Sequence, residues 1–253
     1  CDAYPYTAGS TQLIHVLPPE FQAGGTEALT KRLRDRCTRG EMRARMETGS
    51  DFENITLLAG FENVVAIGLK TEEYRRFEGK SIAEIARSLG KDPFDALFDL
   101  LAAEDCEAGM IDFISDEQDL RDILRAPFSG VISDATYPGT GQVHPRVYGA
   151  FVRLIEKYVV QEKLLTLEQA VHKVTLQASE RFSLAGKGKI EAGADADLLL
   201  FDPENIREKG TYLAPGVCAA GFDEVFVLGG RVIENGEYRG GRNGEMLGLR
   251  AGF

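Results

Sequence analysis

Amphipathic segments with start and stop signals predict the helices of this chain. Ser81 is followed by Glu84 three residues later, the pattern of a capping box, and Gly90 is placed to end that helix. Thr166 and Gln169 repeat the capping pattern at the start of a later segment. Helices are predicted over residues 26–48 (one or two), 81–89, 93–101, 116–125, 148–161 and 166–182.

Short apolar runs bounded by turn residues predict the strands. The run at residues 64–69 is rich in β-branched side chains, which favour strands. Gly229 and Gly230 separate two such runs near the end of the chain and indicate a hairpin with a primed turn. Strands are predicted over residues 55–58, 64–69, 110–114, 128–132, 197–201, 225–228 and 231–234. The chain therefore mixes helices with strands and ends in a small β unit.

Size and charge exclude several classes of protein. With 253 residues, of which 43% are apolar and 27% charged, the chain predicts one large or two modest globular domains rather than a disordered or collagen-like protein. The formal net charge of −11 disfavours general attraction to nucleic acid or to anionic membranes. The sequence has no run of about 18 apolar residues and no basic leader before an apolar stretch, so neither a membrane span nor a signal peptide is predicted.

The cysteines and histidines do not form a familiar metal motif. The four cysteines are widely spread without a C-x-x-C pair, which fits neither a disulfide scaffold nor a cysteine zinc site and favours a reducing cytoplasm. The three histidines include no H-x-H pair and no pair four residues apart. A histidine-rich metal site therefore cannot be assembled from this sequence alone.

Residues 31–47 carry seven basic against three acidic side chains. We favour a solvated helix face for this run over a partner site, because long cationic side chains commonly coat helices. No aromatic residues alternate with the basic ones, so nucleic acid is not predicted as a partner.

Four residues are candidates for chemistry. Asp134 directly follows a predicted strand and precedes a loop rich in Pro and Gly, the position of catalytic carboxylates in βα barrels, although an Asx-turn cap is the alternative. Arg146 offers a bidentate clamp for a carboxylate, or it is a surface residue. Tyr4 and Ser10 lie in a constrained loop and are able to donate to an anion, or else they pack against the core.

Several motifs, taken in order, resemble one protein family. The most specific are residues 4–11 (YPYTAGST) and 144–151 (HPRVYGAF); the strand motif at residues 193–198 (GADADL) is shared more widely. The others are Leu17-Pro18-Pro19 with Gly24-Gly25, residues 79–82, Ser133-Asp134, residues 167–171 and residues 201–203. Together they resemble the C-terminal part of the N-acyl-D-amino-acid deacylases, or D-aminoacylases, of the amidohydrolase superfamily.

The resemblance implies an α/β fold. Residues 1–185 would form the C-terminal part of a (β/α)8 barrel, interrupted by an inserted segment at about residues 12–108, and residues 186–253 would form a small β domain. In the family, the upstream half supplies an H-x-H pair, a further metal ligand and two later histidines, none of which has a counterpart here. We therefore expect this chain to be a fragment.

The resemblance also implies a chemistry and a substrate. The complete enzyme would use zinc to hydrolyse the amide bond of an N-acyl-D-amino acid. Asp134 matches the family's catalytic aspartate, which touches the metal, takes a proton from the attacking water and returns it to the leaving amine. Arg146, with Tyr4 and Ser10, matches the group that holds the substrate's α-carboxylate. One departure is Ala135, where the family commonly has glycine after the catalytic aspartate.

Two alternatives and two further expectations accompany this interpretation. A cyclic amidase of the dihydroorotase or hydantoinase type shares the chemistry but needs no clamp for a free α-carboxylate. A non-catalytic remnant that serves as an interaction module is the other alternative. The fragment alone is expected to be inactive, with zinc absent or weakly bound, because one carboxylate does not make a tight zinc site. An interrupted barrel would expose sheet edges, so we expect self-association.

Overall fold

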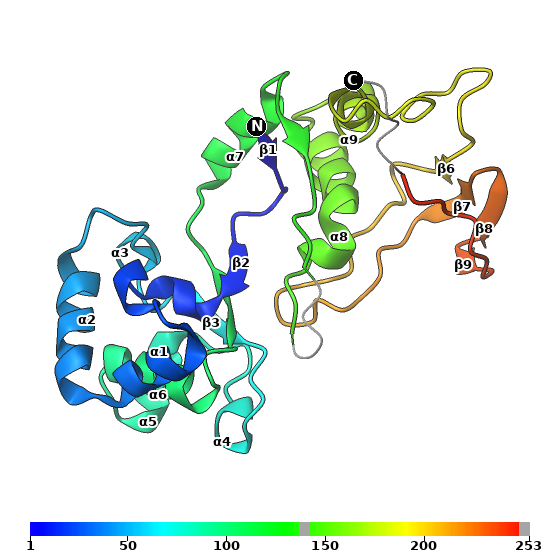
Figure 1. Ribbon diagram of the computed structural model, residues 1–253. Coiled ribbons are helices and arrows are strands. Elements are labelled where there is room, and N and C mark those ends of the chain that lie inside the picture. Colours follow the sequence, from blue (N-terminus) through cyan, green and yellow to red (C-terminus); the bar gives the residue numbers. More distant parts are fainter. Residues whose placement is uncertain (137–141, 248–253) are drawn as a thin grey trace. The chain divides into compact units, whose positions relative to one another are not determined.

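The computed structural model describes residues 1–136 and 142–247, which form two compact units (Figure 1). The first unit consists of Cys1–Pro5, Gln118–Asp134 and Pro145–Phe253, and the second of Tyr6–Glu117 and Ala135–His144. Both units contain helices and strands, which confirms the expected α/β mixture. The predicted division between residues 185 and 186 stays a prediction.

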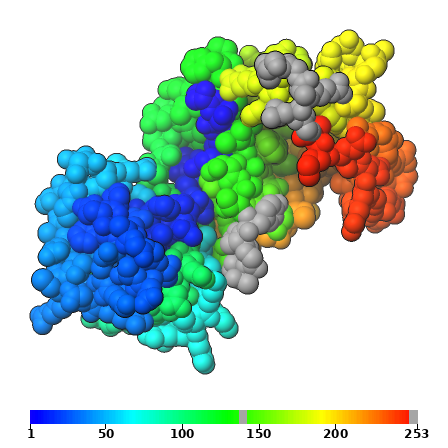
Figure 2. All heavy atoms as spheres, in the orientation of Figure 1, coloured from blue at the N-terminus to red at the C-terminus, as the bar shows by residue number. Residues whose placement is uncertain are grey.

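The second unit packs helices and a small sheet around one core. Strands β2 (Gly9–Gln12), β4 (Gly109–Asp112) and β3 (Val64–Ile67) lie in that order, with both outer strands antiparallel to β4. The blue and light-blue residues of this unit form one continuous mass in the space-filling view (Figure 2). Its helices are η1 (Leu13–Val16), η2 (Pro19–Phe21), α1 (Gly25–Arg34), α2 (Arg36–Thr48), α3 (Ile55–Ala59), α4 (Glu72–Arg75), α5 (Ile82–Leu89) and α6 (Pro93–Ala103).

Side-chain caps explain where these helices begin. Ser81 and Glu84 form the predicted capping box at the start of α5, and Gly90 ends the helix in the left-handed conformation. The segment at residues 26–48 becomes two helices because Asp35 adopts an extended backbone between them. Its carboxylate accepts the N–H of Thr38 at 2.8 Å and so caps α2.

The strand predicted at residues 55–58 is wrong, because these residues form helix α3. Asn54 causes the difference: its buried side chain donates to the carbonyl oxygens of Met46 and Gly49, at 2.9 and 3.0 Å. The Asn54 side-chain oxygen also accepts the N–H of Leu57 at 3.3 Å, which starts the helix. The tertiary contacts of Asn54 therefore decide the conformation of residues 55–58, because this short run has no helical or strand periodicity of its own.

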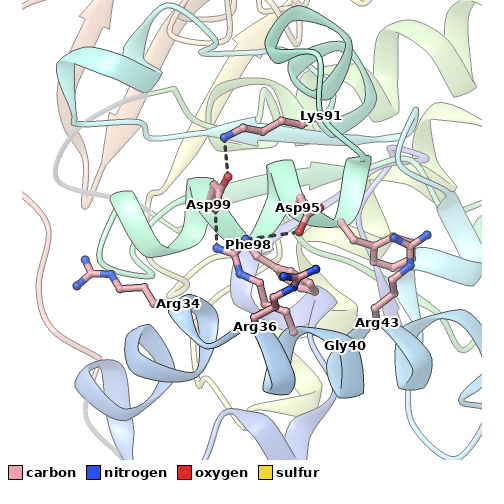
Figure 3. Close-up of a pocket in the computed structure, with 10 residues that line it drawn as sticks. Arg34, Arg36, Gly40, Arg43, Lys91, Asp95, Phe98 and Asp99 are labelled. Atoms are coloured by element: carbon pink, nitrogen blue, oxygen red, sulfur yellow. Dashed lines mark hydrogen bonds and ion pairs between the residues drawn. The ribbon is translucent and has the colours of Figure 1, made fainter.

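Basic side chains from residues 31–47 pack helix α2 against helix α6 (Figure 3). A groove of about 660 Å³ runs between the two helices. Arg39 pairs with Asp99 at 2.5 Å, and Lys91 reaches the other oxygen of Asp99 at 2.6 Å. The guanidinium of Arg43 lies 4.8 Å from the ring centroid of Phe94, a cation–π distance. Part of the run therefore packs two helices together and is not the wholly solvated face that the sequence predicts.

The first unit joins a parallel strand pair, a set of helices and an antiparallel sheet. Strand β1 (Asp2–Ala3) pairs in parallel with β5 (Gly130–Val131). Strands β6 (Leu198–Phe201), β7 (Phe222–Val227), β8 (Gly230–Glu234) and β9 (Glu237–Tyr238) form the sheet in sequence order. The helices are α7 (Glu117–Arg125), α8 (Arg146–Arg153), the π-helix η3 (Leu154–Gln161), α9 (Leu167–Val174) and α10 (Leu176–Arg181). In the part of the chain that the structure describes, none of the helices is long and apolar enough to cross a bilayer.

The structure corrects one predicted helix and one predicted turn in this unit. The helix predicted over residues 166–182 is broken at Thr175, whose φ of −128° and ψ of −91° are not helical. The predicted hairpin between β7 and β8 is present, but Val227 pairs with Gly230, so Leu228 and Gly229 are the central turn residues. Both have positive φ, 47° and 77°, as a primed turn requires.

Lys173 holds α9 to the chain before β5. Its side chain is 5% exposed, and Nζ donates to the carbonyl oxygen of Ala126 at 2.6 Å and to the carbonyl and hydroxyl oxygens of Ser129, both at 3.0 Å. Burial lowers the pKa of the Lys173 ammonium, with the nearby Arg181 adding to the effect. The three hydrogen bonds therefore offset a desolvation cost.

Replacing Lys173 by methionine lowers the free energy of unfolding by about 2 kcal/mol, because buried acceptors lose their donor. The lowered pKa adds a pH dependence of known sign. The unfolded chain binds the proton more tightly, so the stability of the wild type rises with pH as the pH approaches the ordinary lysine value of 10.5, and the methionine variant lacks this rise. Urea unfolding between pH 7 and pH 10 measures both. Lys189→Met, which removes only an exposed pair with Glu191, is the matched control, and an equal loss in both variants would refute the buried role.

Candidate functional site

The parallel pair β1 and β5 delivers two site residues to the same edge. Asp2 lies opposite Gly130 and Ala3 opposite Val131, and the N–H of Ile132 extends the ladder to the carbonyl oxygen of Ala3 at 3.0 Å. Tyr4 is the first residue after β1, and Asp134 follows β5 after two intervening residues. The carboxyl ends of parallel strands meet at one edge, which is where α/β proteins place functional side chains.

Asp134 adopts a backbone conformation that side-chain-bearing residues rarely use. Its φ is 49°, in the left-handed region, where aspartate and asparagine are tolerated better than other non-glycine residues. The side chain is about half exposed, at 53%. A strained, accessible carboxylate just beyond a strand is a common feature of functional sites.

Arg146 is the first residue of α8, and its side chain is 3% exposed. Its Nη2 lies 3.0 Å from Oδ2 of Asp134, and its Cζ lies 4.6 Å from the ring centroid of Tyr4. The structure therefore brings three of the four predicted site residues together within the first unit. A guanidinium has five N–H donors in a planar fork, so it is suited to bind a second carboxylate beside Asp134.

Ser10, the fourth predicted site residue, lies in the other unit. It is part of β2, where it is opposite Ile111 of β4. Its role towards a substrate stays a prediction. The Pro- and Gly-rich loop after Asp134 lies in part, at residues 137–141, outside the described residues.

Arg153 makes two contacts near the candidate site that sequence reasoning missed. Its Nε donates to the carbonyl oxygen of Pro5 at 2.7 Å, and its Nη1 pairs with Oε2 of Glu208 at 2.9 Å. Arg153 thereby attaches the loop that carries Tyr4 to the helix that carries Arg146. One sequence feature could have identified Arg153: it lies seven residues after Arg146, which places both arginines on one face of a helix.

The described residues do not make a zinc site by themselves. Among residues 1–136 and 142–247, no three His, Cys, Asp or Glu side chains lie close enough together to hold a metal ion. Asp134 offers carboxylate oxygens, which zinc accepts as ligands, but its neighbour is the guanidinium of Arg146. A tight zinc site would need further ligands.

Comparison with known proteins gives a consistent picture. The sequence model of the amidohydrolase family matches residues 51–213. Among curated proteins, an N-acyl-D-glutamate deacylase of Alcaligenes xylosoxydans xylosoxydans is 38% identical over 151 residues, covering 60% of this chain and 30% of the relative. A D-aminoacylase of the same organism is 34% identical over 174 residues, covering 69% and 35%. The chain thus spans about a third of the length of these relatives.

Solved structures of similar proteins agree. The structure of an N-acyl-D-glutamate deacylase from Bordetella bronchiseptica, complexed with zinc and a phosphonate that mimics the tetrahedral intermediate, matches with a TM-score of 0.66 and 28% identity. The match covers 91% of this chain and 39% of that one. A D-aminoacylase structure matches with a TM-score of 0.69 and 30% identity, covering 95% of this chain and 40% of the other.

Proposed function

The chain belongs to the amidohydrolase family, and from this membership we propose that it forms the carboxylate-binding and proton-transferring part of a zinc-dependent N-acyl-D-amino-acid deacylase. The observation that carries the proposal is the buried guanidinium of Arg146, held between Tyr4 and Asp134. The similarity to two deacylases and to a zinc-bound deacylase structure supports the substrate class and the metal.

The proposed fold is the C-terminal part of a (β/α)8 barrel. Strands β1 and β5 are parallel neighbours, which supports their assignment as barrel strands. Residues 1–185 would form this part, with an insertion at about residues 12–108, and residues 186–253 the small β domain. The upstream half of the family's barrel, which supplies its H-x-H pair and the further ligands, would complete the metal site.

Arg146 would bind the substrate's α-carboxylate. A bidentate guanidinium supplies both charge and a fixed plane, which orients the amide carbon for attack. Tyr4 holds the guanidinium through its ring face, at 4.6 Å from ring centroid to Cζ, and so limits its rotation. Ser10 would add a hydroxyl donor to the carboxylate.

Asp134 would move the proton. As the oxygen of water bonds to the amide carbon, the carboxylate takes the proton that this water loses. As the carbon–nitrogen bond breaks, the same carboxyl group returns the proton to the leaving nitrogen. The products are a carboxylic acid and a free D-amino acid.

The buried arginine also separates the proposal from its alternatives. A hydantoin lacks a free α-carboxylate for a buried guanidinium to bind, so the buried Arg146 argues against a hydantoinase; dihydroorotate carries a carboxylate, and its turnover is compared directly in the test of function. A non-catalytic module would not require a strained carboxylate 3.0 Å from that guanidinium.

We also propose that this chain self-associates. Among the described residues, β1 and β5 pair only with each other, so each leaves one edge unpaired. Unpaired strand edges favour pairing with another chain. Sedimentation of the purified chain should show a species larger than a monomer, and a clean monomer at high concentration would contradict this part of the proposal.

The test of function uses a complete enzyme, in which this chain is joined to an upstream segment that supplies the remaining metal ligands. We expect hydrolysis of N-acetyl-D-glutamate, with the L-enantiomer and cyclic amides such as dihydroorotate turned over far more slowly. Preferred turnover of dihydroorotate would favour the cyclic amidase instead. The absence of any amide hydrolysis by the zinc-loaded protein would contradict both enzyme readings.

A further inference from the structure

Arg153 lies between two segments of the first unit that are far apart in the sequence. Its Nε donates to the carbonyl oxygen of Pro5 at 2.7 Å, and its Nη1 pairs with Oε2 of Glu208 at 2.9 Å. All three residues belong to the first unit. An arginine side chain has many rotamers, so a single contact leaves the direction of its Nε poorly fixed. The ion pair with Glu208 therefore helps to decide whether Nε points at Pro5.

The backbone that carries Glu208 is fixed by its neighbours. Ile206 is fully buried, at 0% exposed, and belongs to one core cluster with apolar side chains of α8 and η3. Arg207 forms an isolated β-bridge with Ala220, with N–H to oxygen distances of 2.9 and 3.0 Å. A segment held by a buried side chain and a backbone bridge opens rarely. The carboxylate of Glu208 therefore extends from a rigid support.

Glu156 contacts the main chain of Glu208. Its Oε2 accepts the N–H of Glu208 at 2.6 Å, and its Oε1 lies 3.8 Å from Nε of Arg207. Glu156 begins the π-helix three residues after Arg153, so adjacent turns of α8 and η3 bind both the main chain and the side chain of Glu208. The side chains of Glu208 and Glu156 are 11% and 16% exposed. Water and salt therefore screen these contacts less than they screen a surface ion pair.

Tyr4 lies between two fixed points of the backbone. Before it, strand β1 pairs with β5. After it, the carbonyl oxygen of Pro5 accepts the Nε–H of Arg153. The ring of Pro5 restricts its own φ, which further limits the path of the chain. The Tyr4 ring is thus held where its centroid lies 4.6 Å from Cζ of Arg146.

We propose that Glu208 is a positioning residue for Arg146 and acts through Arg153. Its carboxylate holds Nε of Arg153 towards the carbonyl oxygen of Pro5. That contact keeps the ring of Tyr4 over the guanidinium of Arg146. The proposal rests on the proposed function, in which Arg146 binds the α-carboxylate. Glu208 touches neither the substrate nor the reacting atoms, so its effect is on substrate binding and not on proton transfer.

Glu224 provides a matched control in the same unit. Its Oε2 lies 3.0 Å from Nε of Arg231, and its side chain is 17% exposed, so this pair is similar to that of Glu208 in distance and burial. The pair joins β7 to β8 within the hairpin. Among the described residues, no ion pair or side-chain hydrogen bond joins Glu224 to residues 4–5 or to Arg153. Glu224→Gln therefore weakens a comparable pair and leaves the contacts of Arg153 in place.

An NMR measurement on the 253-residue chain tests the positioning without any enzyme activity. The Hε proton of Arg146 reports on the ring of Tyr4, because an aromatic ring shifts the resonance of a proton that lies over its face. Tyr4→Leu defines the resonance in the absence of the ring. Glu208→Gln should move the resonance towards that value, whereas Glu224→Gln should leave it near the wild-type position. Equal shifts in these two variants, or a wild-type resonance equal to that of Tyr4→Leu, would overturn the proposal.

A second variant tests the route through Arg153. Arg153→Met removes the contacts with both Pro5 and Glu208, so the Arg146 resonance should move at least as far as in Glu208→Gln. Adding Glu208→Gln to Arg153→Met should then cause little further shift, because two residues that act through one interaction are not additive. Full additivity of the two shifts would contradict the proposed route.

Steady-state kinetics of the complete enzyme tests the consequence for binding. Glu208→Gln should raise KM for N-acetyl-D-glutamate about tenfold with kcat within about twofold, because a small misplacement of a binding group is costly. Glu224→Gln should change both constants less than about twofold. A fall in kcat with unchanged KM, or equal changes in the two variants, would overturn the proposal. An inactive wild type would contradict the proposed function, while the NMR measurement still decides whether Glu208 positions the Tyr4 ring.

Discussion

Replacing Asp134 by asparagine lowers kcat of the complete enzyme by about 10²–10⁴-fold, the range that a positioned proton-transfer group contributes. Asparagine matches aspartate in size and tolerates the left-handed backbone conformation, here at a φ of 49°, so the loop is expected to keep its shape. What would be lost is the group that we propose accepts the proton from water. Because we propose that Arg146 binds the α-carboxylate, KM should change far less than kcat.

The measurement is the initial rate of N-acetyl-D-glutamate hydrolysis over a range of substrate concentrations, with zinc content determined for each preparation. Asp122→Asn is the matched control, since Asp122 is a carboxylate of the same unit, 62% exposed, whose ion pair is with Arg125. Its kcat should equal that of the wild type. If Asp134→Asn with full zinc content kept kcat within about threefold of the wild type, the carboxylate would not be the proton-transfer group.

Replacing Arg146 by lysine lowers kcat/KM about 100-fold, mostly through KM, because lysine keeps the charge but loses the planar fork. Replacing it by alanine has a larger effect, about 10³-fold, since a charged carboxylate then enters a site without its counter-charge. The fold should tolerate both changes. Asp134 is 53% exposed and is solvated by water when its partner is removed.

The measurement is again steady-state kinetics, with the melting temperature of each variant as a check on folding. Arg181→Lys is a suitable control, because Arg181 pairs with the exposed Asp2 at 3.2 Å and lies outside the proposed site. A loss confined to kcat, with KM unchanged in Arg146→Lys, would contradict the role of Arg146 in binding.

Local signals predict those elements whose ends are specified by neighbouring residues. The capping box of Ser81 and Glu84 needs only the residues within it, so α5 is predicted with its correct ends. The helix at residues 55–59 is missed because its start depends on Asn54, which bonds to the carbonyl oxygens of Met46 and Gly49. Contacts of that kind leave no periodic signal in the short run at residues 55–58.

The candidate site divides in the same way. Asp134 and Arg146 are identified from the sequence because a carboxylate after a strand and an arginine in a motif are visible as residue types. Their contact is not, because it depends on the pairing of β1 with β5, which joins the start of the chain to its middle.

One comparison tests the central claim most directly: the ratio of kcat/KM for N-acetyl-D-glutamate to that for its α-carboxamide, measured in the wild-type complete enzyme and in Arg146→Ala. If Arg146 binds the α-carboxylate, the wild type prefers the acid by about 10²-fold or more, and the variant loses that preference because its activity on the carboxamide is little changed. A wild type that hydrolyses both compounds equally, or a variant that keeps the preference for the acid, would contradict the account.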